Sequence, residues 1–210
     1  MTNSDSTYTS PFSPGEWAVL IFTIVYAGGF FVYFLQIGNR EFIWYILTLA
    51  AIAALIGVTR NVARYPVALL WALSIWGLLH MSGGSIRVGD SVLYNFMVVP
   101  VTHNGELSLL KFDQIVHFYG FGITAWLLWH LLYIHFEALH GTWTIHVYPA
   151  LASMGLGATN EIIEFTAVLA FPNTNVGGYF NTSLDLVLNA LGAIVVMIII
   201  YFVTVQSETN

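Results

Sequence analysis

Three short polar signatures stand out in an otherwise apolar chain, and each has the spacing of a single helical face: Asp113-x-x-x-His117, Glu161-x-x-Glu164 and Asp185-x-x-x-Asn189. Charged residues make up only 8% of the sequence. An ionisable group at membrane depth costs about 2.5–3.5 kcal/mol on insertion scales and usually marks a functional position. The three signatures therefore predict one polar site inside a helical membrane protein.

The chemistry that fits these residue types is metal binding between helices. Carboxylates and imidazoles that project from neighbouring helices form such sites in helical bundles. The predicted ligands are Asp113, His117, Glu161, Glu164 and Asp185. Oxygen and imidazole ligands suit Zn, Mg, Mn or Fe, and the chain has no Cys to supply sulfur. Four buried carboxylates also need a cation or shared protons to lie close together.

Three of these residues are predicted to take part in catalysis. Glu161 or Glu164 would serve as base or ligand, and His117 as ligand or acid, in metal-assisted activation of water.

A purely structural interpretation of the signatures stays open. Asp113 could cap a helix, and Asp185 could favour a helix start through the helix dipole. Asn189 could form a hydrogen bond between helices, and Glu164 could be protonated.

Four further histidines argue against haem. His130, His135, His140 and His146 do not repeat with the spacing of stacked haem ligands. The step of 13 residues from His117 to His130 and the step of five from His130 to His135 each turn about 140° away from one face. Glycine pairs at Gly28-Gly29 and Gly120-x-Gly122 predict close helix packing and not a nucleotide site. Neither haem nor a nucleotide is therefore expected.

The composition places this chain in the membrane. Of its 210 residues, 58% are hydrophobic and only 8% are charged, whereas soluble domains carry about 25% charged residues. Membrane lipids are the expected surroundings. The net charge is −6 with only five Lys and Arg, which excludes a basic nucleic-acid interface.

About six hydrophobic segments have lengths near the 20 residues of a membrane crossing. They predict an all-α polytopic transmembrane bundle with helices at about Trp17–Ile37, Phe42–Val58, Pro66–Met81, Gln114–Phe136, Pro149–Phe171 and Leu184–Val205. Residues 17–205 form one transmembrane domain between a disordered tail, 1–16, and a short C-terminal tail, 206–210.

The one long connection is residues 82–112, between the third and fourth segments. Asn104-Gly105 lies between two apolar runs in it, which predicts a hairpin. A loop of this length is often a lid, and an ordinary surface loop is the alternative.

Six crossings would bring every polar signature to one membrane face. His80 ends the third segment on that face, Asp113 opens the fourth, Glu161 lies late in the fifth and Asp185 opens the sixth. The expected location is a prokaryotic plasma membrane. Two arginines in the short loop Thr59–Tyr65 favour cytoplasmic termini.

The signatures resemble those of known bacterial and archaeal membrane proteins. Asp113-Gln-Ile-Val-His117-Phe is similar to the D-x-x-x-H-F signature of VanZ-like proteins, and Asp185-Leu-Val-Leu-Asn189-Ala-Leu-Gly192 to their later D-x-x-x-N-x-x-G. The closer similarity is to YjdF-like inner-membrane proteins, whose E-x-x-E resembles Glu161-Ile-Ile-Glu164.

The resemblance covers roughly residues 40–205 and extends to His80-Met-Ser-Gly-Gly and Gly89-Asp90. It implies that His80, Asp90 and Asn189 belong to the same pocket. VanZ-like proteins have Glu-x-x-Gln where Glu164 stands, and often an Arg before the last Asp, which is absent here. The resemblance therefore supports the site and carries over no reaction.

Three classes of function follow from the sequence. The first is a membrane enzyme, a metal-dependent hydrolase or transferase that acts on an amphiphilic or lipid-linked small molecule. The second is an ion- or proton-coupled transporter, in which paired carboxylates bind cations or protons. The third is a non-catalytic membrane scaffold whose polar residues only join helices.

Overall fold

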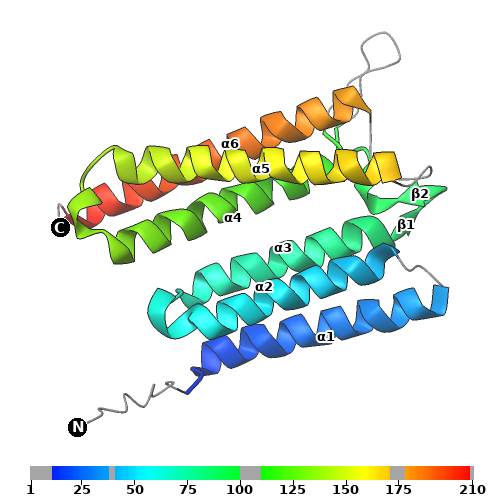
Figure 1. Ribbon diagram of the computed structural model, residues 1–210, viewed down its shortest axis with the longest axis horizontal. Helices are drawn as coiled ribbons and strands as arrows, with labels where there is room; N and C mark the ends of the chain where they lie inside the picture. Colours follow the sequence, from blue (N-terminus) through cyan, green and yellow to red (C-terminus); the bar gives the residue numbers. More distant parts are fainter. Residues whose placement is uncertain (1–10, 38–40, 100–109, 171–177, 209–210) are drawn as a thin grey trace. The chain divides into compact units, whose positions relative to one another are not determined.

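The structure is a computed structural model that describes residues 11–37, 41–99, 110–170 and 178–208. Helices make up nearly all of it, which confirms the all-α class (Figure 1). The long helices of the described residues are α1 (Pro14–Ile37), α2 (Glu41–Ala63), α3 (Val67–Ser85), α4 (Phe112–His135), α5 (Thr144–Ala170) and α6 (Tyr179–Glu208).

Five of these helices are long and apolar enough to cross a membrane, and α5 is the one that is not among them. It contains three polar residues in its second half, Asn160, Glu161 and Glu164. Its 27 residues correspond to about 40 Å of helix, which exceeds the roughly 30 Å of a bilayer core. Five spans are therefore supported by composition, and a sixth crossing through α5 stays a prediction.

The chain divides into two compact units at Ser74, within α3. The first unit contains α1, α2 and the start of α3. Ser13 and Glu16 form a capping box at the start of α1: the Ser13 N–H donates to Glu16 Oε2 (2.7 Å) and the Glu16 N–H to Ser13 Oγ (3.2 Å). A Cβ at Gly28 or Gly29 would meet no described atom within 4 Å, so the predicted close packing is not found there.

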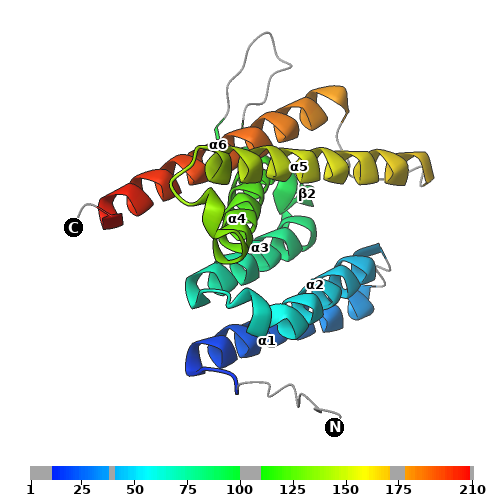
Figure 2. The same ribbon diagram turned by 60° about the vertical axis from the view of Figure 1, so that its left-hand side comes forward.

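The second unit contains the rest of α3 and the three helices α4, α5 and α6, which lie side by side (Figures 1 and 2). Because α5 runs back along α4, the end of α5 lies beside the starts of α4 and α6. A small apolar core, formed by Ala125, Ala150, Ala193 and Met197, joins the three helices.

The connection between α3 and α4 begins later than predicted, because α3 continues to Ser85. Its described part forms a small hairpin of β1 (Arg87–Val88) and β2 (Ser91–Val92), followed by the short 3-10 helix η1 (Leu93–Asn95). Gly89 has φ of +62° in the hairpin turn, a conformation that favours glycine. The hairpin predicted at Asn104-Gly105 lies outside the described residues.

Candidate functional site

Helix α4 opens with a cap that fixes the first polar signature. The backbone N–H of Lys111, the N-cap residue, donates to Gln114 Oε1 (2.5 Å). Asp113 is thus not the N-cap that the structural interpretation allowed; it lies in the first turn of the helix. Its carboxylate and the His117 imidazole, four residues later, then share one face of α4.

The His117 side chain contacts polar groups through both of its ring nitrogens. Its Nε2 lies 3.7 Å from Asp113 Oδ1, and its Nδ1 lies 3.0 Å from Asn189 Oδ1 and 3.6 Å from Glu161 Oε1. An amide oxygen only accepts hydrogen bonds, so this arrangement places a proton on Nδ1. The lone pair of a neutral His117 is then on Nε2, on the side of Asp113.

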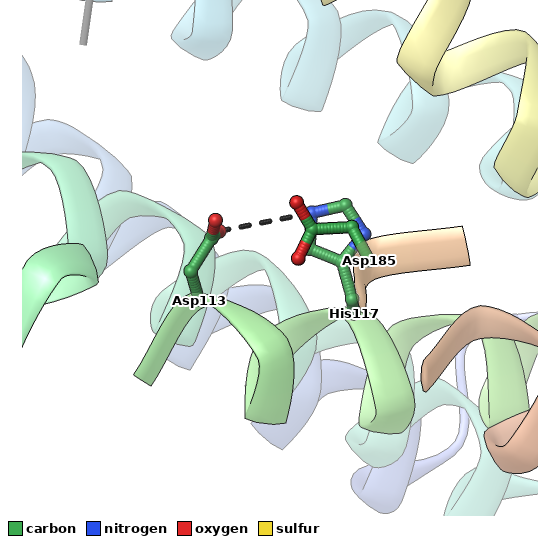
Figure 3. A group of neighbouring side chains, drawn as sticks. All are labelled: Asp113, His117 and Asp185. Carbon is green, nitrogen blue, oxygen red and sulfur yellow. Dashed lines mark ion pairs between the residues drawn. The ribbon is translucent and has the colours of Figure 1, made fainter. Parts of the chain in front are cut away.

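Asp185 is fully buried and held by two amides (Figure 3 shows it beside Asp113 and His117). Gln114 Nε2 donates to Asp185 Oδ1 (3.2 Å), and Asn181 Nδ2 donates to Asp185 Oδ2 (2.6 Å). Asn181 Nδ2 also lies 3.3 Å from Asp113 Oδ2. The two amides therefore orient both aspartates and join the starts of α4 and α6.

The two glutamates of α5 differ in their surroundings. Glu164 is half-buried and accepts a hydrogen bond from Asn160 Nδ2 (2.8 Å). Glu161 is only 6% exposed, and neither of its carboxylate oxygens has a hydrogen-bond partner among the described residues. Glu161 Oε1 lies 3.6 Å from His117 Nδ1, just beyond hydrogen-bond distance. Glu161 is therefore a buried acid without a built-in donor, which is costly in a site without a ligand or bound proton.

Two overlapping groups of these side chains could hold a cation. The first is Asp113, His117 and Asp185, and the second is His117, Glu161 and Glu164; the ligand atoms within each group lie within 4.8 Å of one another. The ligand atoms of a tetrahedral zinc ion, each about 2.0–2.2 Å from the metal, are about 3.3–3.6 Å apart. A small inward movement of the side chains would thus complete either group.

Small residues allow the three helices to approach closely around this cluster. A Cβ on Gly192 would collide with the backbone of Phe118, and one on Gly157 would lie 2.7 Å from Asn189 Nδ2. Asp185, Asn189 and Gly192 follow the spacing of one helical face of α6. The D-x-x-x-N-x-x-G signature therefore combines two polar side chains with the glycine that lets α6 pack against α4.

Two residues that the resemblance placed in the pocket have other immediate surroundings. Asp90 is exposed in the turn of the β1–β2 hairpin. His80 is half-buried near the end of α3, and its Nδ1 lies 2.7 Å from the hydroxyl of Tyr94. Neither residue belongs to the two cation-binding groups found among the described residues, whereas Asn189 contacts His117 directly.

Two amide residues of the site, Gln114 and Asn181, were not predicted from the sequence. Gln114 is 0% exposed, and Asn181 contacts two aspartates and Lys111, whose Nζ lies 3.3 Å from Asn181 Oδ1. A signal for Asn181 was present, because it lies four residues before Asp185 on the same helical face. Gln114 was visible as a polar residue inside the Asp113–His117 signature.

The comparisons with known proteins agree with a membrane protein. The model of a family described as "Predicted membrane protein (DUF2238)" matches residues 18–206. No curated protein matches the chain, and no solved structure matches it.

Proposed function

The chain belongs to this family of predicted membrane proteins, and we propose that its carboxylate–histidine cluster binds a divalent cation and catalyses hydrolysis or group transfer on an amphiphilic, lipid-like substrate. The observation that carries the proposal is Glu161. A purely structural network would give a buried carboxylate hydrogen-bond donors, as Asp185 has, but both oxygens of Glu161 lack a partner among the described residues. Such a group suits a reactant or a ligand.

The cation would bind between Asp113, His117 and Asp185. His117 offers the lone pair of Nε2, because the bond from Nδ1 to Asn189 places the proton on the other nitrogen. Gln114 and Asn181 hold the two aspartates, as outer-shell partners do for metal ligands. Two carboxylates and a neutral imidazole carry a charge of −2, which a divalent cation would neutralise. Zn, Mg, Mn and Fe accept such ligands.

In this proposal Glu161 is the acid and base of the reaction. A bound divalent cation polarises an ester oxygen or lowers the pKa of bound water. Glu161 faces the imidazole and has free acceptor oxygens, so it can take the proton of attacking water. It can then return that proton to the leaving group. Glu164, fixed by Asn160, would share the charge of this step or join the ligands.

A second candidate function is proton-coupled transport, which one observation favours. His117 lies between carboxylates at both ring nitrogens, with Asp113 on the Nε2 side and Glu161 on the Nδ1 side. This arrangement could pass a proton from one carboxylate to the other through the ring.

The location and wider kinship of the protein are further parts of the proposal. The chain would reside in a prokaryotic plasma membrane, surrounded by lipids, with the cluster near one face. The shared D-x-x-x-H-F and D-x-x-x-N-x-x-G signatures support a relationship to VanZ-like and YjdF-like proteins.

Metal content of the purified protein tests the proposal directly. We expect the parent protein, purified in dodecyl maltoside, to retain about one equivalent of a divalent metal by elemental analysis. Asp185→Asn should weaken metal binding at least about tenfold. Changes to outer-shell residues alone weaken metal affinity about 10- to 100-fold, and this change removes a negatively charged ligand. Asp90→Asn is the matched control, because it makes the same chemical change at an exposed position.

Glu161→Gln separates the candidate functions. If Glu161 is the acid and base, this variant retains metal bound by the parent and remains folded. If the parent instead binds no metal and moves protons in liposomes, and Glu161→Gln loses this activity, that result would support the transporter hypothesis in place of the enzyme hypothesis. If the parent binds no metal and moves no protons, and Asp185→Asn and Glu161→Gln are both as stable as the parent, the scaffold hypothesis is the one that remains.

A further inference from the structure

The two glutamates of α5 carry more acceptor oxygens than the described residues supply donors. Both oxygens of Glu161 and Oε2 of Glu164 accept no hydrogen bond from these residues, and Asn160 donates to Glu164 Oε1 alone. Glu161 is 6% exposed and lies 3.6 Å from His117, so its carboxylate is directed into the cluster. Asp185, in contrast, already accepts hydrogen bonds from two amides. A ligand for the glutamates must therefore bring hydrogen-bond donors or positive charge.

The spacing of the second cation group suits a primary ammonium group. The ligand atoms of His117, Glu161 and Glu164 lie within 4.8 Å of one another. An ammonium group donates three hydrogen bonds to oxygens about 2.7–2.9 Å away, and its tetrahedral geometry separates these oxygens by about 4.4–4.7 Å. A tetrahedral metal ion needs its ligand atoms about 3.3–3.6 Å apart. The two glutamates can therefore hold an ammonium group with less movement than a metal ion requires.

The charge of the chain around the cluster favours a cation and disfavours an anion. Arg87 and Lys111 are the only basic residues in the sequence from 75 to 210, which contains eight Asp and Glu. Arg87 is exposed on β1, and Lys111 Nζ lies 3.3 Å from Asn181 Oδ1. Proteins usually hold phosphate groups with Arg and Lys. A divalent cation in the first group would balance that group alone and leave the charge of the two glutamates.

The position of Glu164 on α5 allows an amphiphile to reach the second group. Its side chain is half-buried, whereas Asp185 of the first group is 0% exposed. The apolar residues that flank it in the chain, Ile163 and Phe165, are both exposed. An apolar tail can therefore lie against these side chains while its headgroup contacts Glu164, with Glu161 behind it.

We propose that Glu161 and Glu164 bind a primary ammonium headgroup of the amphiphilic substrate. This inference rests on the proposed function and names the class of substrate for the same site. The first group would hold the metal and the second the ammonium group beside it, because His117 belongs to both. Glu164 Oε2 and one oxygen of Glu161 accept hydrogen bonds from the ammonium group. The other oxygen of Glu161 stays available for the proton of attacking water.

Three amphiphiles with one tail and different headgroups test the inference on the full chain in dodecyl maltoside at neutral pH. Octylamine is cationic, octanol is neutral and octyl phosphate is anionic. A saturable rise in the unfolding temperature with ligand concentration measures the binding of each. We expect octylamine to bind at least about tenfold more tightly than the other two, because a charged donor strengthens each hydrogen bond to a carboxylate.

The variant Glu164→Gln should weaken octylamine binding about ten- to hundredfold, the effect of losing one charge-assisted hydrogen bond. Its matched control is Glu137→Gln in the short 3-10 helix η2 (Glu137–Leu139), which follows the end of α4. Glu137 is exposed, so this control removes the same charge away from the cluster. Its affinity for octylamine should stay within about twofold of the parent value. Unfolding without ligand verifies that both variants are folded.

Metal analysis of the same samples separates this inference from the proposed function. A parent that retains metal and binds all three amphiphiles equally would overturn the ammonium site and leave the metal site standing. An equal loss of affinity in Glu137→Gln and Glu164→Gln would do the same. Octylamine binding that depends on Glu164 in a metal-free parent would support the ammonium site and overturn the metal-dependent function. About two equivalents of bound metal, with no effect of octylamine, would assign the glutamates to a second metal ion instead.

Discussion

Gln114 is the residue whose replacement tests most directly how α4 and α6 are joined. It is 0% exposed and makes three hydrogen bonds. Its Oε1 accepts from the Lys111 backbone N–H, and its Nε2 donates to Asn181 Oδ1 and to Asp185 Oδ1. Leucine in this position has a similar volume and can make none of them. The change Gln114→Leu therefore removes two of the hydrogen bonds between α4 and α6 without opening a large cavity.

The magnitude follows from the three bonds. Each of the two bonds to neutral partners contributes about 1 kcal/mol, and the bond to the Asp185 carboxylate contributes about 2 kcal/mol. Their total loss is about 4 kcal/mol, from which better apolar packing by leucine subtracts about 1 kcal/mol. We expect the free energy of unfolding of Gln114→Leu to fall by about 3 kcal/mol. Much of that loss comes from leaving Asp185 buried with one donor fewer.

Unfolding of the purified protein in mixed micelles of dodecyl maltoside and increasing sodium dodecyl sulfate measures this free energy. Gln36→Leu is the matched control, because Gln36 is exposed on α1 and the change should alter stability by less than about 0.5 kcal/mol. A double-mutant cycle with Asp185→Leu isolates the pair, and its coupling energy should be about 1.5–3 kcal/mol. A loss below 1 kcal/mol in Gln114→Leu, or no coupling to Asp185, would refute this reasoning.

Two further predictions concern helix packing and the first unit. Gly192→Ala should destabilise the protein by about 1–3 kcal/mol, because its Cβ would meet the Phe118 backbone. Gly155→Ala, where no atom lies within 4 Å, should stabilise it by about 0.5–1 kcal/mol. Thermal unfolding in detergent compares the two variants, and a Gly192→Ala protein as stable as the parent would contradict the close approach of α4 and α6. Arg60→Gln should cost no more than about 1 kcal/mol, because its ion pair with Glu16 (3.3 Å) is partly exposed, and 1 M salt should reduce that cost; a cost above 2 kcal/mol that is insensitive to salt would show that the pair is shielded from solvent.

The sequence alone was enough to predict the class of fold and which polar side chains share a helical face. Long apolar segments in a chain with 8% charged residues predict membrane helices, because a helix satisfies the hydrogen bonds of its own backbone inside the bilayer. The spacings of Asp113 to His117 and of Asp185 to Asn189 fix which side chains share a helical face, since this depends only on the helix repeat. The topology of alternating crossings then predicts that these faces meet at one end.

Only the tertiary structure decided which atoms of the site meet. The three-residue spacing treats Glu161 and Glu164 alike, but tertiary packing buries Glu161 beside His117 of α4 without a hydrogen-bond donor among the described residues, while Asn160 donates to Glu164. The roles of Gln114 and Asn181 were likewise hidden, because a lone amide in a helix becomes a partner of Asp185 only when α4 and α6 approach closely. That approach depends on backbone contact at Gly192, which is a property of two helices and cannot be read from either one.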